Sequence, residues 1–181
     1  MEPTITLINT ALSTAKILNG YGGYRRGKRK EDDAAIRKKL MIQLDELNQH
    51  LLNIMEDGDL DIRIAAKKVA DVVDLFRNDI ELAATGQNYP FFSIQRSVSV
   101  RILKSLITYD HQIIKALDKS VKTISDLELS LVKGDDESAI TGLREVKGEL
   151  TTTKGTFANR ISIMKKVEKV QKEKRRWRLR S

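Results

Sequence analysis

The chain contains no cysteine and has few of the residues that interrupt helices. Its 181 residues include only two prolines and ten glycines, and aromatic residues make up 5%. Without cysteine, disulfides, thiolate nucleophiles and cysteine-ligated zinc sites are excluded. Apolar residues account for 40% of the sequence and charged residues for 32%. This composition is typical of a soluble, mainly helical protein.

Long apolar runs are missing as well. No stretch approaches the ~18 consecutive apolar residues that indicate a spanning helix. The first residues, Met1-Glu2-Pro3, lack the positive start of a secretory signal. We therefore expect a cytoplasmic protein, with peripheral association at a membrane as a further option.

Apolar residues recur every three or four positions along most of the chain, which is the spacing of one helix face. The pattern predicts helices over about 3–18, 32–56, 60–85, 93–132 and from 136 into the C-terminal tail. Short polar turns at 56–59 and 133–137 favour antiparallel neighbours. We predict an all-α fold: an up-and-down antiparallel helical bundle of about five helices, one domain over residues 1–181, with a long C-terminal helical hairpin.

Three glycines interrupt the pattern of the last predicted helix. Gly142, Gly148 and Gly155 lie inside it, and each costs about 1 kcal/mol relative to alanine in a helix interior. The glycines predict a bend or break near 148–156, or a close contact with a neighbouring helix there.

The net charge of +8 is unevenly distributed. Residues 1–30 sum to +5 and the last 31 residues to +9, whereas residues 31–60 sum to −5 and 121–150 to −3. In an up-and-down bundle, the two basic segments meet at one pole, and the acidic turns lie toward the other. A basic pole favours an anionic partner.

The basic pole supplies the candidate contact residues for that partner. The N-terminal group is Arg25, Arg26, Lys28, Arg29 and Lys30. The C-terminal group is Lys165, Lys166, Lys172, Lys174, Arg175, Arg176, Trp177, Arg178 and Arg180. A basic helix with a tryptophan edge suits a membrane surface, nucleic-acid phosphates or an acidic protein groove. The plainer alternative is a solvated helix end whose tryptophan packs on the bundle.

The segment NGYGGYRRGKRKEDD, residues 19–33, contains the spacing G-x-x-x-x-G-K from Gly22 onward. This spacing matches a phosphate-binding P-loop, but Arg29 stands where serine or threonine would hold magnesium, and a helix precedes the segment instead of a strand. We predict a basic connector or an anion-contact loop at the corner of the bundle. Tyr21 and Tyr24 can stack on bases, lie at a lipid interface or cover the end of the bundle.

Other candidate sites are weak. Asp57, Asp59 and Asp61 resemble half of a calcium loop, but the glycine and glutamate that complete such a loop are absent, so we predict helix capping. His50 and His111 have no carboxylate or histidine at the spacing of a bundle metal site. The apolar stripes contain almost no polar residue. We therefore predict no catalysis, metal, cofactor or small-molecule substrate.

The order of parts favours an association module over an enzyme. An amphipathic N-terminal helix, a bundle and a basic cluster are similar in outline to HeLo-type and MLKL-like four-helix cell-death domains. The resemblance implies that the cations of residues 25–30 contact acidic lipids, and that the bundle then assembles and damages the membrane. We predict a non-catalytic module whose basic pole engages an anionic membrane surface or an acidic protein, with homo-oligomers as a further option.

The alternative function is a sequence-nonspecific nucleic-acid-binding subunit of a larger nucleoprotein assembly. Such binding is dominated by phosphate contacts and depends steeply on salt. Arg101, Lys104 and Lys115 would extend its basic surface along the fourth predicted helix. The acidic middle of the chain argues against this alternative, because no basic stripe runs along the bundle.

Overall fold

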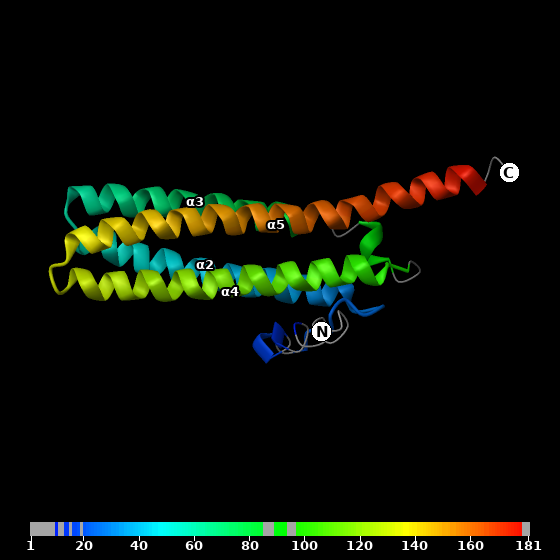
Figure 1. The fold of residues 1–181 in the computed structure, drawn as a ribbon, viewed down its shortest axis with the longest axis horizontal. Coiled ribbons are helices and arrows are strands. Elements are labelled where there is room, and N and C mark those ends of the chain that lie inside the picture. The colour runs from blue at the N-terminus through cyan, green and yellow to red at the C-terminus, as the bar shows by residue number, and fades with distance from the viewer. Residues whose placement is uncertain are drawn as a thin grey trace. The chain divides into compact units, whose positions relative to one another are not determined.

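The structure is a computed structural model that describes residues 10, 13–14, 16–18, 20–84, 89–93 and 97–178, the side chains of 84, 90 and 166–178 excepted. Within these residues the fold is all-helical, which confirms the predicted class (Figure 1). Its elements are α2 (Arg29–Asp57), α3 (Leu60–Ala84), the short 3-10 helix η2 (Pro90–Phe92), α4 (Val100–Leu131) and α5 (Asp136–Arg178). The predicted helix over 3–18 falls mostly outside the described residues.

The turn between α2 and α3 follows the prediction from sequence. The carboxylate of Asp59 accepts a hydrogen bond from the backbone N–H of Ile62 at 2.9 Å, which makes Asp59 the N-cap of α3. Gly58 has no room for a side chain, because an added Cβ would lie 2.8 Å from the carbonyl oxygen of Ile54. Capping is therefore confirmed for Asp59.

The start of α4 corrects the predicted helix over 93–132, whose start at Ser93 is wrong. The helix begins seven residues later, at Val100, and the carbonyl of Ser99 accepts the backbone N–H of Leu103 at 3.2 Å. The residues just before Ser93 form η2 instead, and both of its phenylalanines are buried.

The chain forms two compact units. Unit 1 comprises residues 1–37, 82–112 and 156–181, and unit 2 comprises residues 38–81 and 113–155. Unit 1 holds 20 cationic and 7 acidic residues, a formal charge of +13, whereas unit 2 holds 13 cationic and 18 acidic residues, a formal charge of −5. Both basic segments thus belong to unit 1, and both acidic turns belong to unit 2.

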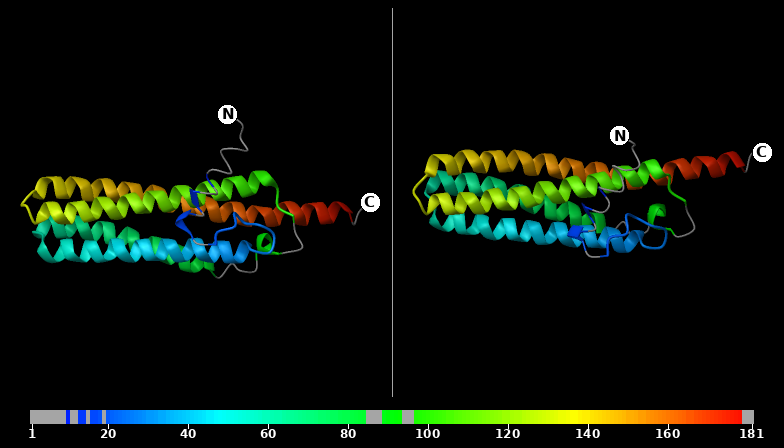
Figure 2. Two further views of the ribbon diagram at one scale, coloured as in Figure 1. Left: turned by 90° about the horizontal axis from the view of Figure 1, so that it is seen from below. Right: turned by 60° about the horizontal axis from the view of Figure 1, so that its bottom comes forward.

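In unit 2, the hairpin of α2 and α3 lies beside the hairpin of α4 and α5 (Figure 2). Along α2, Gln43 donates to the carbonyl of Ile114 at 3.1 Å, and His50 contacts Glu128 at 2.6 Å. Residue numbers therefore increase in the same direction along α2 and α4, so these two neighbouring helices run parallel. Consecutive helices run antiparallel. The apolar stripes of all four helices fill the core, which includes Leu44, Leu47, Val69, Val73, Leu117, Ile124, Leu143 and Leu150.

Helix α5 runs without a break from Asp136 to Arg178, so the predicted break near 148–156 is wrong. Gly148 and Gly155 face open space, with no atom within 4 Å of an added Cβ, and therefore impose no close contact. The close contact lies at Gly142, where an added Cβ would come within 2.6 Å of a Leu127 methyl carbon. One glycine of the three thus serves packing against α4.

Replacing Gly148 or Gly155 by alanine is expected to stabilise the protein. Each substitution removes backbone entropy from the unfolded chain and meets no atom in the folded one, which predicts a gain of about 1 kcal/mol or less. Gly142→Ala is the matched control and should gain less, because its methyl group meets Leu127. Urea unfolding followed by circular dichroism measures all three. Loss of stability in Gly148→Ala would contradict the open environment.

Candidate anion-binding loop

The loop before α2 has an unusual backbone. Gly20, Gly23 and Gly27 have φ values of 84°, 66° and 92°, a region that glycine enters freely. Tyr24 has a φ of 61°, which is uncommon for a residue with a side chain. Such a conformation persists only where the surrounding structure holds it.

Asp32 holds this backbone from the first turn of α2. Its carboxylate accepts hydrogen bonds from the backbone N–H groups of Gly22, at 2.7 Å, and Tyr24, at 2.6 Å. Burial raises the pKa of Asp32, and these two hydrogen bonds oppose that rise. Neighbouring amides that converge on one anion form a nest. The nest of the glycine-rich loop is therefore filled by the protein's own carboxylate, which leaves these amides engaged and argues further against a P-loop.

The two tyrosines of the loop pack inside unit 1. Tyr24 is fully buried, and its ring meets Tyr21 and Phe91 edge-on at centroid distances of 5.8 and 5.5 Å. Tyr21 is also buried, and its hydroxyl donates to Asp110 at 2.8 Å. Of the three roles considered for these rings, the structure therefore shows the packing role.

Arg160 of α5 ties the loop to two helices. Its Nε donates to Asp110 of α4 at 2.6 Å, and its Nη2 donates to Asp33 of α2 at 2.7 Å. The same Nη2 also donates to the hydroxyl of Tyr24. The side chain of Arg160 is fully buried, and its guanidinium lies over the rings of Tyr24 and Phe157. One side chain thus joins α2, α4, α5 and the loop within unit 1.

The buried charges around Arg160 are balanced. Asp33 also accepts from Arg37 at 2.9 Å, so two carboxylates face two guanidinium groups. Burial disfavours the charge of Arg160, but Tyr24, Asp110 and Asp33 outweigh it and raise the pKa of Arg160 well above its usual value. Within the described residues Nη1 of Arg160 has no hydrogen-bond partner. The guanidinium is therefore held as a charged structural group.

Arg29 differs from the other cations predicted to contact an anion. It is buried, and its Nη1 donates to the carbonyl of Phe91 at 3.0 Å. Burial lowers the pKa of Arg29, and the nearby Arg26 lowers it further. Its guanidinium fixes η2 from within unit 1, so we leave Arg29 out of the contact surface proposed below.

The remaining loop cations lie on the surface. Arg25, Arg26 and Lys28 of the loop and Lys30 of the first turn of α2 are exposed, and we name these four residues the basic loop. Lys165 of α5 is exposed too. The other predicted contacts lie outside the described side chains or residues: Lys166, Lys172, Lys174, Arg175, Arg176, Trp177, Arg178 and Arg180. Contact of these C-terminal residues with an anionic partner remains a prediction from the sequence.

The expectation that the apolar stripes hold almost no polar residue is wrong. Arg160 lies three residues after Phe157 and four before Met164, on the buried face of α5. Asp110 occupies the equivalent place in α4, between Leu106 and Ile113. The signal was present in the sequence: opposite charges interrupt two apolar stripes at core positions. A buried pair is the arrangement that satisfies both charges.

The histidines have ordinary partners. His50 is half-buried beside Glu128, and His111 lies 3.3 Å from the hydroxyl of Thr14. In the described part of the chain, no group of three or more acidic or histidine side chains is placed to bind a metal ion.

Comparison with protein-family models, curated protein sequences and solved structures finds no match for this chain. None of the helices that the structure describes combines the length and the apolar character needed to cross a bilayer.

Arg160→Met is expected to destabilise the protein by about 3–5 kcal/mol, because it leaves Asp110 buried without its cation and Asp33 with Arg37 alone. The matched control is Lys119→Met, which breaks an exposed pair with Glu149 and should cost about 1 kcal/mol or less. Urea unfolding of both variants measures the difference. Equal losses would show that the buried pair does not hold the loop.

Stability is expected to fall as the pH rises above about 10. Burial, first of all, raises the pKa values of Tyr21 and Tyr24 above the usual 10. Their contribution is complete below that value and is lost above it, since the unfolded chain then releases protons that the folded chain retains. Unfolding free energies between pH 8 and 11.5 test this. In the double variant Tyr21→Phe/Tyr24→Phe, the free energy of unfolding should decline less steeply with pH. An unchanged slope would refute the assignment of this pH dependence to the two tyrosines.

Proposed function

We propose that this chain is a non-catalytic association module whose unit 1 binds an anionic membrane surface through the basic loop. One observation carries the proposal: four exposed cations project from the loop and from the first turn of α2, next to a loop backbone that is fixed by buried charges, in a unit of formal charge +13. A loop whose backbone is already fixed loses little backbone entropy when its cations meet a charged surface.

The magnitude of the attraction indicates that the basic loop acts together with a second element. Each lysine or arginine near an anionic membrane contributes about 1 kcal/mol. Four such residues support only weak binding, and stable anchoring takes two signals. The C-terminal part of α5 belongs to the same unit, and its sequence combines many cations with Trp177. We assign the second signal to this segment.

Nucleic acid is the less favoured partner. Single strands are bound largely by stacking of bases on aromatic rings, but Tyr21 and Tyr24 are buried. Of the helix-four cations considered for a wider phosphate surface, Arg101 and Lys104 belong to unit 1 and Lys115 to unit 2. An acidic protein would satisfy the same loop cations as a membrane. Both partners are outcomes of the experiment below.

Two finer features complete the proposal. Residues 3–18 form the fifth, amphipathic helix of the bundle, and copies of the chain assemble after binding to the membrane. Both follow from the sequence pattern and from the outline shared with membrane-active cell-death bundles. The assembled form would then act on the membrane without any catalytic step.

The test is sedimentation with liposomes that contain or lack an anionic lipid, in about 150 mM salt, where surface charges act over about 8 Å. Lys28→Glu/Lys30→Glu should weaken binding to anionic liposomes at least tenfold, since each cation near the surface contributes about 1 kcal/mol. The matched control, Lys115→Glu/Lys122→Glu, changes the net charge equally on exposed residues of unit 2 and should bind like the parent.

Excess duplex DNA in the same mixture separates the partners. Retention on anionic liposomes despite the duplex supports the membrane proposal, and leakage of a trapped dye would then measure damage. If the duplex abolishes binding to the liposomes, nucleic acid would be the favoured partner. If the protein binds neither the anionic liposomes nor the duplex, the partner of the basic loop would be an acidic protein. Equal weakening in both double variants would show that only net charge matters.

A further inference from the structure

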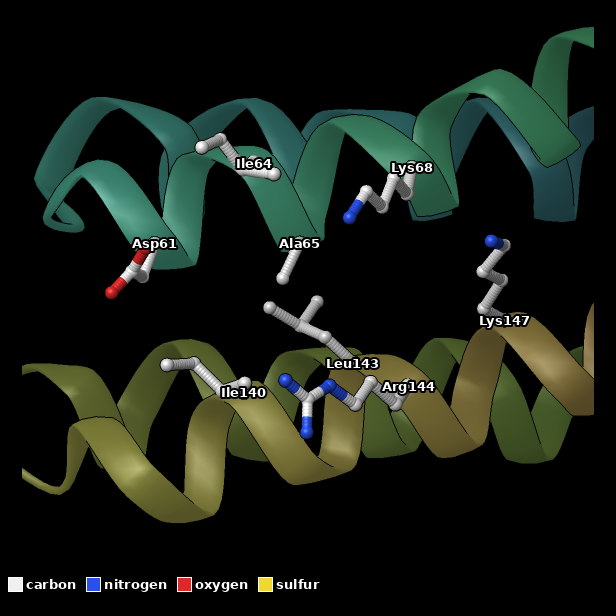
Figure 3. A pocket seen from close by; sticks show the side chains of 8 residues that line it. All are labelled: Asp61, Ile64, Ala65, Lys68, Ile140, Leu143, Arg144 and Lys147. Carbon is white, nitrogen blue, oxygen red and sulfur yellow. The ribbon is translucent and has the colours of Figure 1, made fainter.

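A pocket of about 560 Å³ opens between α3 and α5 inside unit 2 (Figure 3). Its apolar lining consists of Ile64 and Ala65 from α3 and of Ile140 and Leu143 from α5. Figure 3 shows the side chain of Leu143 pointing across the gap toward Ala65. Alanine at this position leaves the space that a larger residue would fill.

The polar lining of the pocket is mostly cationic. Lys68 of α3 and Arg144 and Lys147 of α5 surround the apolar floor, opposed by the single carboxylate of Asp61. The amino groups of the two lysines reach into the space between the helices from opposite sides (Figure 3). Among the described residues, none of the three cations forms a hydrogen bond or an ion pair with another side chain.

The charge of this pocket is opposite in sign to that of the unit around it. Unit 2 has a formal charge of −5, yet the four charged residues of the lining sum to +2. Unpaired cations that gather in an otherwise acidic unit repel one another. An anion bound between them would remove that repulsion.

A second hollow of about 420 Å³ adjoins the pocket and shares Ile64 and Lys68 with it. Met55 contributes to its lining together with Arg63 and Lys67, and the exposed surface within it is almost entirely apolar. The second hollow therefore extends the apolar surface of the pocket and adds two further cations beside it.

We propose that this pocket binds a small phosphate monoester with an apolar body, such as a short alkyl chain or an aryl group. The volume is in the range of small-molecule sites. The lining residues 61–68 cover only about 10 Å of helix at 1.5 Å per residue, which suits a small molecule better than a protein segment. A phosphate monoester carries a charge of about −1.5 to −2 at pH 7, which matches the +2 lining.

Each part of the lining has a role in this complex. Arg144 offers a planar fork of N–H donors that suits phosphate oxygens. Lys68 and Lys147 add point charges from the two facing helices, and the body of the ligand lies on Ile64, Ile140 and Leu143. The basic loop belongs to unit 1, so the pocket stands independently of the proposed membrane function.

The experiment is a titration of the full chain with decyl phosphate, followed by the methyl NMR signals of Ile64, Ile140 and Leu143. We expect saturable shifts at these methyl groups. Lys147→Glu and Arg144→Glu should each weaken binding about tenfold or more, the effect of losing one charge-assisted hydrogen bond. Both side chains are exposed, so the fold should persist. Lys122→Glu, an exposed cation outside the pocket, and Lys28→Glu/Lys30→Glu should bind like the parent.

Two further probes test the chemistry of the ligand. Decanoate has the same apolar body with a single charge and should bind about tenfold more weakly, whereas inorganic phosphate lacks the body and should cause no saturable methyl shift. Decanoate binding as tight as decyl phosphate would overturn the phosphate assignment. Absence of shifts at the three residues, or equal weakening by Lys122→Glu, would overturn the site itself.

Discussion

The ion pair between Arg160 and the carboxylates of Asp110 and Asp33 is the constraint on which unit 1 depends. A buried charge without a partner is so costly that each of these groups must find the others before the core can close. Their geometry therefore dictates where α2, α4 and α5 lie within the unit. The hydroxyl of Tyr24 accepts from the same guanidinium, and this contact together with the carboxylate of Asp32 holds the strained backbone of the loop.

The two units are stabilised in different ways. Unit 2 is stabilised by the packing of apolar stripes and keeps most of its charges on the surface. Unit 1 places charges inside as well, where they fix a loop that has little regular structure of its own. The backbone that carries the cations of the basic loop is therefore held in place. The buried charges thus position the exposed ones, and the proposed membrane contact depends on both.

Much of the fold could be predicted from the sequence because helix spacing is a local signal. Capping by Asp59 and the bounds of α3 follow from neighbours a few residues away. The start of α4 and the continuity of α5 could not be predicted, since they depend on distant packing and on which face of the helix a glycine occupies. Arg29 looks like its exposed neighbours in the sequence, and its burial and the backbone carbonyls that it contacts, such as that of Phe91, distinguish it in the structure.

The contacts of Arg160 also set an order of events. This residue lies 136 positions from Tyr24 and 127 from Asp33 along the chain. Closing loops of that length is slow compared with forming local helix contacts. On a ribosome the basic loop is made early, yet its lock is made only after α5 has been synthesised. The basic loop is therefore made before α5, and its backbone acquires its final contacts only after α5 has been made.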